Sequence, residues 1–218
     1  MLHPHIRANR RSRGFTLVEL LTVIVIMALL IVMVAPNVFQ ALSGTSLTTA
    51  GDLVRNKLTQ AQQEAIAKNT PVEVRFYKYT DRDYSEDGDQ VRAIQLFRLQ
   101  NDPVNPFVRI EEPTYLEGGV VLSSKVLTPS GELPDAMSSF TDFDSPDDEG
   151  YCTRSTSGAS YWAFRFYPDG STNLPGNRVW YYTALSALDE QREETPKNFY
   201  TIQIDPLTGA VRTFRPGD

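Results

Sequence analysis

Few residues in this chain have a type and spacing suited to catalysis. Its two histidines, His3 and His5, lie near the N-terminus, and its single cysteine, Cys152, has no disulfide partner within the chain. If the first 14 residues are removed, the mature chain has no histidine, which excludes Ser-His-Asp catalysis and a histidine-ligated metal site. The sequence therefore predicts no enzyme, no catalytic or metal-binding residue and no cofactor.

A single carboxylate, Glu19, interrupts an apolar segment of 21 residues, 15–35. As a helix with a rise of about 1.5 Å per residue, this segment spans roughly 31 Å, the thickness of a bilayer's hydrocarbon core. A secretory signal peptide fits poorly, because its apolar region is shorter and ends in small residues. An ordinary membrane anchor fits the length but does not explain Glu19, since a charge in that zone is costly and needs a partner. We expect a transmembrane helix over 15–35 in which Glu19 has a function.

Charge is distributed unevenly along the 218 residues, whose net charge is −6. Residues 72–218 carry 14 basic against 24 acidic side chains, whereas residues 1–14 carry four arginines and no acid: Arg7, Arg10, Arg11 and Arg13. Basic residues beside a span favour the cytoplasmic side, so we expect a cytoplasmic N-terminus, a single pass of the inner membrane and a periplasmic or extracytoplasmic C-terminal domain. The acidic body argues against general nucleic-acid binding, which needs a cationic face.

Residues 13–21, RGFTLVELL, resemble the type III signal of type IV prepilins and type II secretion pseudopilins. In that family the prepilin peptidase cuts after the glycine and methylates the new N-terminal residue, so the resemblance implies cleavage between Gly14 and Phe15 and a methylated amine on Phe15. Glu19 stands at the family's matching fifth position. It lies four residues from that amine on the same helix face, and it can neutralise its own amine or that of a neighbouring subunit.

A second helical segment follows Pro36. Proline lacks an N–H and clashes with the carbonyl of Val32, so Pro36 either ends the span or, as in the family, kinks one continuous helix, which we favour. Apolar residues then recur at spacings of three and four, and Pro71 disfavours helical geometry in Thr70. We predict an amphipathic continuation over 36–70 with these apolar positions: Leu47, Ala50, Val54, Leu58, Ala61 and Ala65.

From residue 71 the period changes to that of strands. Alternating or apolar runs predict strands at 72–77, 93–99, 107–110, 119–123, 162–167, 179–183, 199–204 and 210–214. Residues 205–209, DPLTG, predict a hairpin turn between the last two, and 138–158 reads as a long loop. The predicted fold class is α+β, with the long helix packed on an antiparallel sheet domain of residues 71–218.

The body also resembles known families. Residues 61–74, 166–170, 202–205 and 208–211 are similar to the helix-to-strand junction and late strands of the GspH/FimT group of minor pseudopilins. Residues 47–51, 72–77 and 92–95 resemble the Verru_Chthon cassette protein D family.

The chain has two acidic clusters. Calcium is a ligand to consider for them, because major pseudopilins of secretion systems resemble calcium binders in a loop of their sheet domain. The first begins like an EF-hand at Asp83, but its twelfth position is Ile94, where a bidentate Glu is needed. For both we favour solvated loops, the second containing Asp142, Asp144, Asp147, Asp148 and Glu149. Near the C-terminus, Arg212 and Arg215 resemble the DNA-binding arginines of some FimT-type pilins, although charge on an exposed strand explains them better.

The interpretation is a structural minor pseudopilin or pilin-like subunit of a type IV filament-like or type II secretion-like assembly. The alternative is a DNA-uptake or surface-binding minor pilin of the FimT type. A third reading, an enzyme tethered by a pilin-like anchor, lacks a nucleophile motif. Expected partners are the prepilin peptidase, other pilin-like subunits, the inner-membrane assembly platform and the bilayer, but not DNA. The expected processing residues are Gly14 and Phe15, and the expected assembly residues are Glu19 and Pro36.

Overall fold

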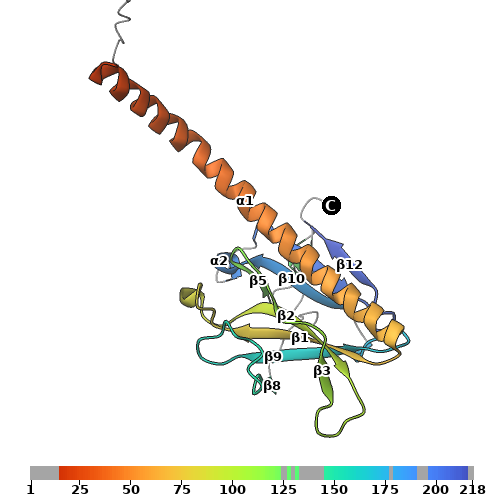
Figure 1. The fold of residues 1–218 in the computed structure, drawn as a ribbon. Coiled ribbons are helices and arrows are strands. Elements are labelled where there is room, and N and C mark those ends of the chain that lie inside the picture. Colours follow the sequence, from red (N-terminus) through yellow and green to blue (C-terminus); the bar gives the residue numbers. More distant parts are fainter. Residues whose placement is uncertain are drawn as a thin grey trace, which may run out of the picture. The chain divides into compact units, whose positions relative to one another are not determined.

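The computed structural model describes residues 15–123, 127–128, 131–132, 145–176, 179–190 and 196–215 (Figure 1). Side chains 33–43 are not described. The chain divides into two units, Met1–Leu42 and Ser43–Asp218, and each is described by itself.

Helix α1 runs from Leu17 to Lys68 and contributes to both units. In the first unit, every described Leu, Ile, Val, Met and Phe side chain from Phe15 to Val32 is exposed. Within the part of the chain that the structure describes, no helix has the length and apolar character needed to cross a membrane.

The second unit is an antiparallel sheet with the C-terminal half of α1 against one face (Figure 1). Its strand order is β12-β11-β10-β5-β2-β1-β9-β8, and two short strands, β3 and β4, also pair with β2. The strands of this sheet are β1 (Val72–Tyr79), β2 (Gln90–Leu99), β3 (Phe107–Arg109), β4 (Thr114–Tyr115), β5 (Val120–Ser123), β8 (Ser145–Pro146), β9 (Ser160–Phe166), β10 (Trp180–Ser186), β11 (Tyr200–Ile204) and β12 (Val211–Phe214). The smaller elements are a 3-10 turn η1 (Ser85–Asp87), helix α2 (Ala187–Glu190) and a separate pair of strands, β6 (Leu127–Thr128) and β7 (Gly131–Glu132). The α+β class with an antiparallel sheet is confirmed.

The core forms where the predicted apolar stripe of α1 meets the sheet. Val54, Leu58 and Ala61 are fully buried, because residues three and four apart share one face of a helix. Alternate residues of β1 meet them from the sheet, and the rings of Phe76, Phe164 and Tyr182 stack against one another. All six α1 positions predicted from the spacing are buried.

The C-terminal end of α1 has a local cause. Asn69 adopts a positive φ of 49°, and the N–H groups of Asn69 and Thr70 donate to the carbonyls of Ile66 and Ala65, at 3.3 and 3.2 Å. These two bonds make a Schellman motif, in which asparagine is one of the few residues that tolerates the left-handed conformation. Pro71 then starts the extended chain that leads into β1.

Each predicted strand has a counterpart in the sheet. The predicted turn at 205–209 joins β11 and β12 as an antiparallel hairpin, with Gly209 at a φ of 64° and the Asp205 carboxylate accepting the N–H of Leu207 at 2.9 Å. Strands β4 and β8 and helix α2 were not predicted, because elements of two to four residues carry almost no periodic signal.

Candidate processing and assembly site

The described residues begin at Phe15, the first residue after the predicted cleavage point. Phe15 precedes α1, and its side chain is 83% exposed. Gly14 and the leader arginines Arg7, Arg10, Arg11 and Arg13 lie outside the described residues. The structure therefore describes the side of the cut that would become the mature N-terminus.

Thr16 and Glu19 form a reciprocal capping arrangement at the start of α1. The main-chain N–H and the hydroxyl of Thr16 both donate to Oε2 of Glu19, at 2.9 and 2.8 Å. The N–H of Glu19 donates to the Thr16 hydroxyl oxygen at 3.2 Å, and the N–H of Leu20 donates to the Thr16 carbonyl at the same distance. This is a capping box, with Thr16 as the N-cap residue and Glu19 at the third helical position.

The box gives Glu19 a local role that the sequence analysis did not identify. A carboxylate at this position satisfies N–H groups that have no partner inside the helix, and it lies at the positive end of the helix dipole. The signal was present as Thr-x-x-Glu directly before an apolar run. The charge of Glu19 alone predicts a partner for this residue but does not identify the Thr16 hydroxyl as that partner.

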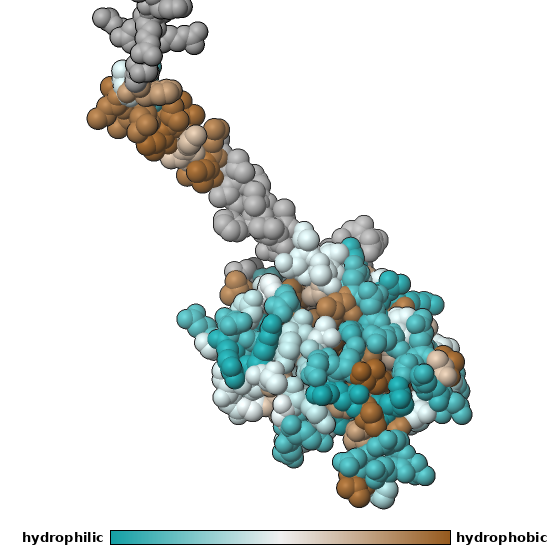
Figure 2. Space-filling model, in the orientation of Figure 1, coloured by the Kyte–Doolittle hydropathy of each residue, from teal (hydrophilic) through white to brown (hydrophobic). Residues whose placement is uncertain are grey.

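The helix after the box is apolar on all sides. Exposed apolar side chains continue around it from Leu17 to Val32, and Figure 2 shows the hydrophobic colouring of this segment. A helix that buries only one face carries a stripe, whereas a helix that is hydrophobic all round needs an apolar environment on every side. The described part of this segment therefore has no single apolar stripe that one packed surface could cover.

Pro36 falls within α1, which is assigned as one helix from Leu17 to Lys68. Its side chain lies among those that the structure does not describe. The kink expected at Pro36 remains a prediction.

The first acidic cluster is a folded turn. Asp81 accepts the N–H of Asp83 at 2.9 Å and the hydroxyl of Tyr79 at 3.2 Å, and Asp89 accepts the hydroxyl of Thr80. These carboxylates therefore hold the connection between β1 and β2. Across the described ranges, no group of three or more acidic, histidine or cysteine side chains is arranged to hold a metal ion.

The second acidic cluster is divided between two local roles. Asp147 accepts the N–H groups of Tyr151 and Cys152, at 3.2 and 2.8 Å. Glu149 contacts the guanidinium of Arg75 at 3.4 Å. Asp142 and Asp144 lie outside the described residues, so their part of the predicted loop is not described.

Cys152 packs in a second buried cluster with Tyr77, Tyr79 and Ala93. Its exposed fraction is 6%, and burial raises the pKa of its thiol from 9.0 to about 12. A thiol in this state is a poor nucleophile, because the thiolate is the reactive form.

The two C-terminal arginines have different surroundings. Arg212 is exposed on β12, whereas Arg215 lies 4.7 Å from the ring centre of Tyr200 and 3.4 Å from the Asp52 carboxylate. Tyr200 itself donates to Asp52 at 2.7 Å. Arg215 therefore joins the end of β12 to α1. Because its guanidinium is engaged there, the two arginines give little support for a shared DNA-binding surface.

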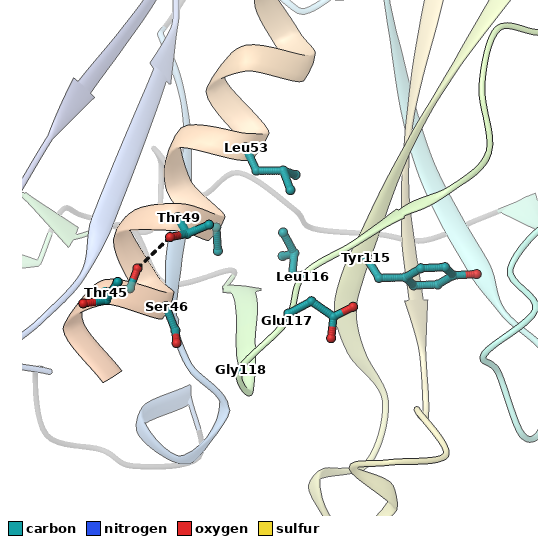
Figure 3. A pocket seen from close by; sticks show the side chains of 9 residues that line it. Thr45, Ser46, Thr49, Leu53, Tyr115, Leu116, Glu117 and Gly118 are labelled. Carbon is teal, nitrogen blue, oxygen red and sulfur yellow. Dashed lines mark hydrogen bonds between the residues drawn. The ribbon is translucent and has the colours of Figure 1, made fainter. Parts of the chain in front are cut away.

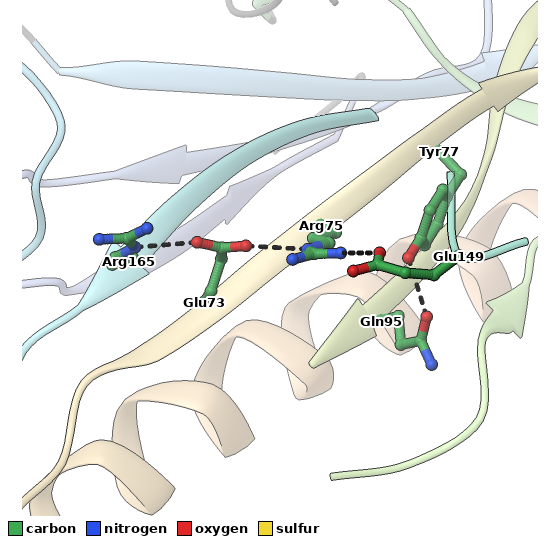
Figure 4. Close-up of polar contacts among 6 residues, drawn as sticks. All are labelled: Glu73, Arg75, Tyr77, Gln95, Glu149 and Arg165. Carbon is green, nitrogen blue, oxygen red and sulfur yellow. Dashed lines mark hydrogen bonds and ion pairs between the residues drawn. The ribbon is translucent and has the colours of Figure 1, made fainter. Parts of the chain in front are cut away.

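A chain of charged side chains crosses the sheet face opposite α1 (Figure 4). Glu73 receives Nε of Arg75 on one carboxylate oxygen and Nε of Arg165 on the other, both at 2.8 Å. Arg75 is buried, with its guanidinium 4.1–4.7 Å from the ring centres of Phe97, Tyr161 and Phe107. The alternation of Val72, Glu73, Val74 and Arg75 predicted a strand, but it gave no sign that other segments cover the face that carries Glu73 and Arg75.

A hollow of about 190 Å³ lies in the second unit between α1 and the segment 115–118 (Figure 3). Thr45, Thr49 and Leu53 line it from the helix. Glu117, the one carboxylate among its lining residues, is paired with Arg154 at 2.9 Å. The described lining residues include no nucleophile with an adjacent base.

Comparison with known proteins found similar solved structures and a matching family. Among solved structures, the chain is similar to the minor pseudopilin EpsH from the type 2 secretion system of Vibrio cholerae. For one EpsH structure the identity is 13% and the TM-score is 0.44, and the alignment covers 79% of this chain and 99% of the EpsH chain. For a second, the identity is 14% and the TM-score is 0.42, and the alignment covers 80% of this chain and 97% of the EpsH chain.

No curated protein matches the chain. Residues 9–35 match the family described as the prokaryotic N-terminal methylation motif. The match includes Gly14, Phe15, the capping box and the apolar helix. The chain therefore carries a prepilin-type N-terminal methylation motif.

Proposed function

We propose that this chain is a non-enzymatic structural subunit, of the minor pseudopilin or pilin-like kind, in a type IV filament-like or type II secretion-like assembly. The observation that carries the proposal is the methylation motif over 9–35. In this motif the Glu19 carboxylate is part of the N-terminal cap of a helix that has apolar side chains on every side. The prepilin peptidase and other pilin-like subunits are the partners that this motif implies.

Cleavage between Gly14 and Phe15 would create a cation at the start of α1. An amine at this point is unfavourable beside the positive end of the helix dipole, so it needs a nearby carboxylate. Glu19 is at the third helical position and supplies that carboxylate. The leader arginines hold the uncut N-terminus in the cytoplasm, where the peptidase acts.

Assembly would then proceed by exchange of partners at Glu19. In a single subunit the carboxylate is satisfied by Thr16 and by its own amine. In a filament it would accept the Phe15 amine of a neighbour, and this contact would fix the axial offset between adjacent helices. The apolar side chains of α1 would face lipid before assembly and neighbouring helices after it.

Two substitutions separate the charge of Glu19 from its capping role. Glu19→Gln keeps a side chain that can complete a capping box but removes the charge, whereas Thr16→Ala keeps the charge but removes the cap. Both variants should be cleaved and methylated in host membranes. Crosslinking through cysteines introduced at Leu20 and Ile24 should join Thr16→Ala to partner subunits and should fail for Glu19→Gln.

The opposite result would contradict the proposal. If Glu19→Gln crosslinks like the unsubstituted protein while Thr16→Ala fails, Glu19 acts in assembly only as part of the cap. If both crosslink normally, neither the charge nor the cap sets the contact between subunits.

A further inference from the structure

The hollow between α1 and the segment 115–118 is apolar and held in shape by its own contacts. Leu53 points from the helix toward Leu116 in the facing segment (Figure 3). The N–H of Leu116 donates to the carbonyl of Arg92 at 2.7 Å, and Gly118 approaches α1 so closely that a Cβ there would meet the Ser46 side chain at 2.8 Å. The volume of about 190 Å³ exceeds the roughly 150 Å³ of an apolar cavity that accepts benzene, so a valine side chain fits.

An exposed side chain of suitable size and chemistry lies at the tip of the hairpin that joins β2 and β3. Val104 is 80% exposed, and this hairpin projects from the sheet (Figure 1). Asp102 accepts the N–H groups of Val104 and Asn105, at 2.8 and 3.3 Å. Gln100 donates its N–H to the carbonyl of Pro106 at 2.9 Å and its side-chain amide to that of Asn105 at 2.7 Å. The tip is therefore ordered in advance, which lowers the entropy cost of inserting it into a partner.

The tip and the hollow lie at opposite ends of β2 within the second unit. Tyr115, which lines the hollow, pairs with Ala93, whereas Phe107, at the base of the tip, pairs with Leu99. These two pairs are about 20 Å apart, at roughly 3.4 Å per strand residue. Val104 therefore cannot reach the hollow of its own chain, and a contact between the two sites needs two chains. A contact between different surfaces of two copies is heterologous, and it repeats as a ring or an open filament.

The charges at both sites permit this contact between acidic chains. Glu117, at the hollow, is paired with Arg154 at 2.9 Å, and Asp102 is engaged by two N–H groups of its own turn. Neither site therefore brings a carboxylate without a partner to the contact. Elsewhere the excess of acidic over basic side chains in residues 72–218 favours repulsion between two copies.

We propose that the Val104 tip of one subunit inserts into the hollow of a second copy, so that this chain repeats along the filament. The inference rests on the proposed function and deepens it, because it names a second copy of the chain as a neighbour. Val104 of one copy packs between Leu53 and Leu116 of the other. Because a single hairpin tip buries far less area than a standard interface, this contact sets the offset between subunits while the apolar part of α1 supplies most of the association.

Disulfide crosslinking in host membranes tests the position of the contact. Chains with Val104→Cys are co-expressed with differently tagged chains that carry Thr49→Cys in the hollow, and mild oxidation should join the two. The native Cys152 is buried and does not compete. Two control substitutions each replace one member of the pair: Gln60→Cys, exposed on the same helix outside the hollow, and Val108→Cys, on β3 away from the tip. Both control pairs should stay unlinked, because a disulfide needs Cα atoms within about 7 Å.

A second cysteine pair tests the chemistry of the contact. Asn105→Cys and Thr45→Cys lie beside the tip and the hollow, so Val104 remains available for substitution. Val104→Asp should lower the crosslinked fraction of this pair at least about tenfold, because it removes the burial of an apolar side chain and brings a charge to an apolar hollow. Val104→Ile should keep the crosslink. The fold should tolerate both changes, since Val104 is exposed.

Three results would overturn the inference: no crosslink between Val104→Cys and Thr49→Cys, crosslinks of Thr49→Cys to other proteins only, or an equal crosslinked fraction with Val104→Asp. The cysteines at Leu20 and Ile24 separate this failure from failure of the proposed function. If they join subunits while the Val104–Thr49 pair does not, the chain assembles without this contact. If neither pair joins subunits, the proposed function fails as well.

Discussion

The Thr16 hydroxyl and the Glu19 carboxylate hydrogen-bond across the first turn of α1 at 2.8 Å, and the main-chain N–H groups of both residues join the same arrangement. Thr16 would be the second residue of a chain cleaved after Gly14. The cap therefore survives cleavage, and the new amine would lie one residue before it.

Loss of the cap should loosen the start of the helix. Thr16→Ala removes the hydroxyl and should destabilise the first turn by about 0.5–2 kcal/mol, whereas Thr16→Ser should be close to neutral. Amide hydrogen exchange at Val18 and Glu19 in detergent measures the effect. Equal exchange in the alanine variant would show that the cap does not hold this turn.

Close packing between α1 and β11 makes Gly51 sensitive to substitution. A Cβ at Gly51 would overlap the Tyr200 ring, which Asp52 holds by a hydrogen bond, whereas a Cβ at Gly44 meets nothing within 4 Å. Gly51→Ala should lower the free energy of unfolding by about 1–3 kcal/mol through overpacking. Gly44→Ala, in the same helix, should raise it by about 0.5–1 kcal/mol, because alanine loses less backbone entropy. Urea unfolding followed by tryptophan fluorescence compares the two, and equal effects would contradict the packing.

The shared carboxylate of Glu73 should matter more to stability than any surface ion pair. Glu73→Ala leaves the buried guanidinium of Arg75 without its close partner and should cost roughly 3–5 kcal/mol. Glu112→Ala breaks the exposed pair with Arg109 and should change the unfolding free energy little. A small effect of Glu73→Ala in the same urea assay would mean that the charge is compensated in another way.

The two faces of the sheet differ in how well the sequence predicts them. Val72, Val74 and Phe76 alternate with Glu73 and Arg75, which sufficed to predict β1 and the side that packs on α1. The same alternation predicts a solvated opposite face, because a polar residue is normally exposed. That face is instead covered by segments distant in sequence, including the one that carries Glu149, and no local pattern reports such contacts.

The candidate site was predictable in a similar, partial way. Glu19 and the glycine-phenylalanine step stood out because their types conflict with an apolar helix or mark a known signal. The capping role of Thr16 follows from a local spacing and could have been predicted.

The free energy of unfolding should fall at alkaline pH, because the buried thiol of Cys152 and several buried tyrosine hydroxyls stay protonated in the folded state. Burial raises the pKa of Cys152 from 9.0 to about 12, and it raises those of Tyr77, Tyr79 and Tyr182 above 10.0. A raised pKa in the folded state contributes stability below the unfolded pKa that is lost as the pH rises toward the folded value. The urea midpoint should therefore stay level as these groups remain protonated up to about pH 9, and fall between about pH 9 and 12.

The same burial predicts slow thiol chemistry. An aromatic disulfide reagent should label Cys152 slowly in the folded protein at pH 8 and rapidly in urea. Rapid labelling without urea, or an alkaline midpoint that does not fall, would show that the cluster around Cys152 is open to water.

The central claim is that this chain is processed as a prepilin, and the mass of the mature protein tests it most directly. Protein extracted from host membranes should lack residues 1–14 and begin at Phe15 with one added methyl group. Gly14 replaced by a bulky residue, as in Gly14→Val, should give only the uncut chain and provides the control. An unprocessed wild-type chain, or a mature N-terminus at any residue other than Phe15, would contradict the account.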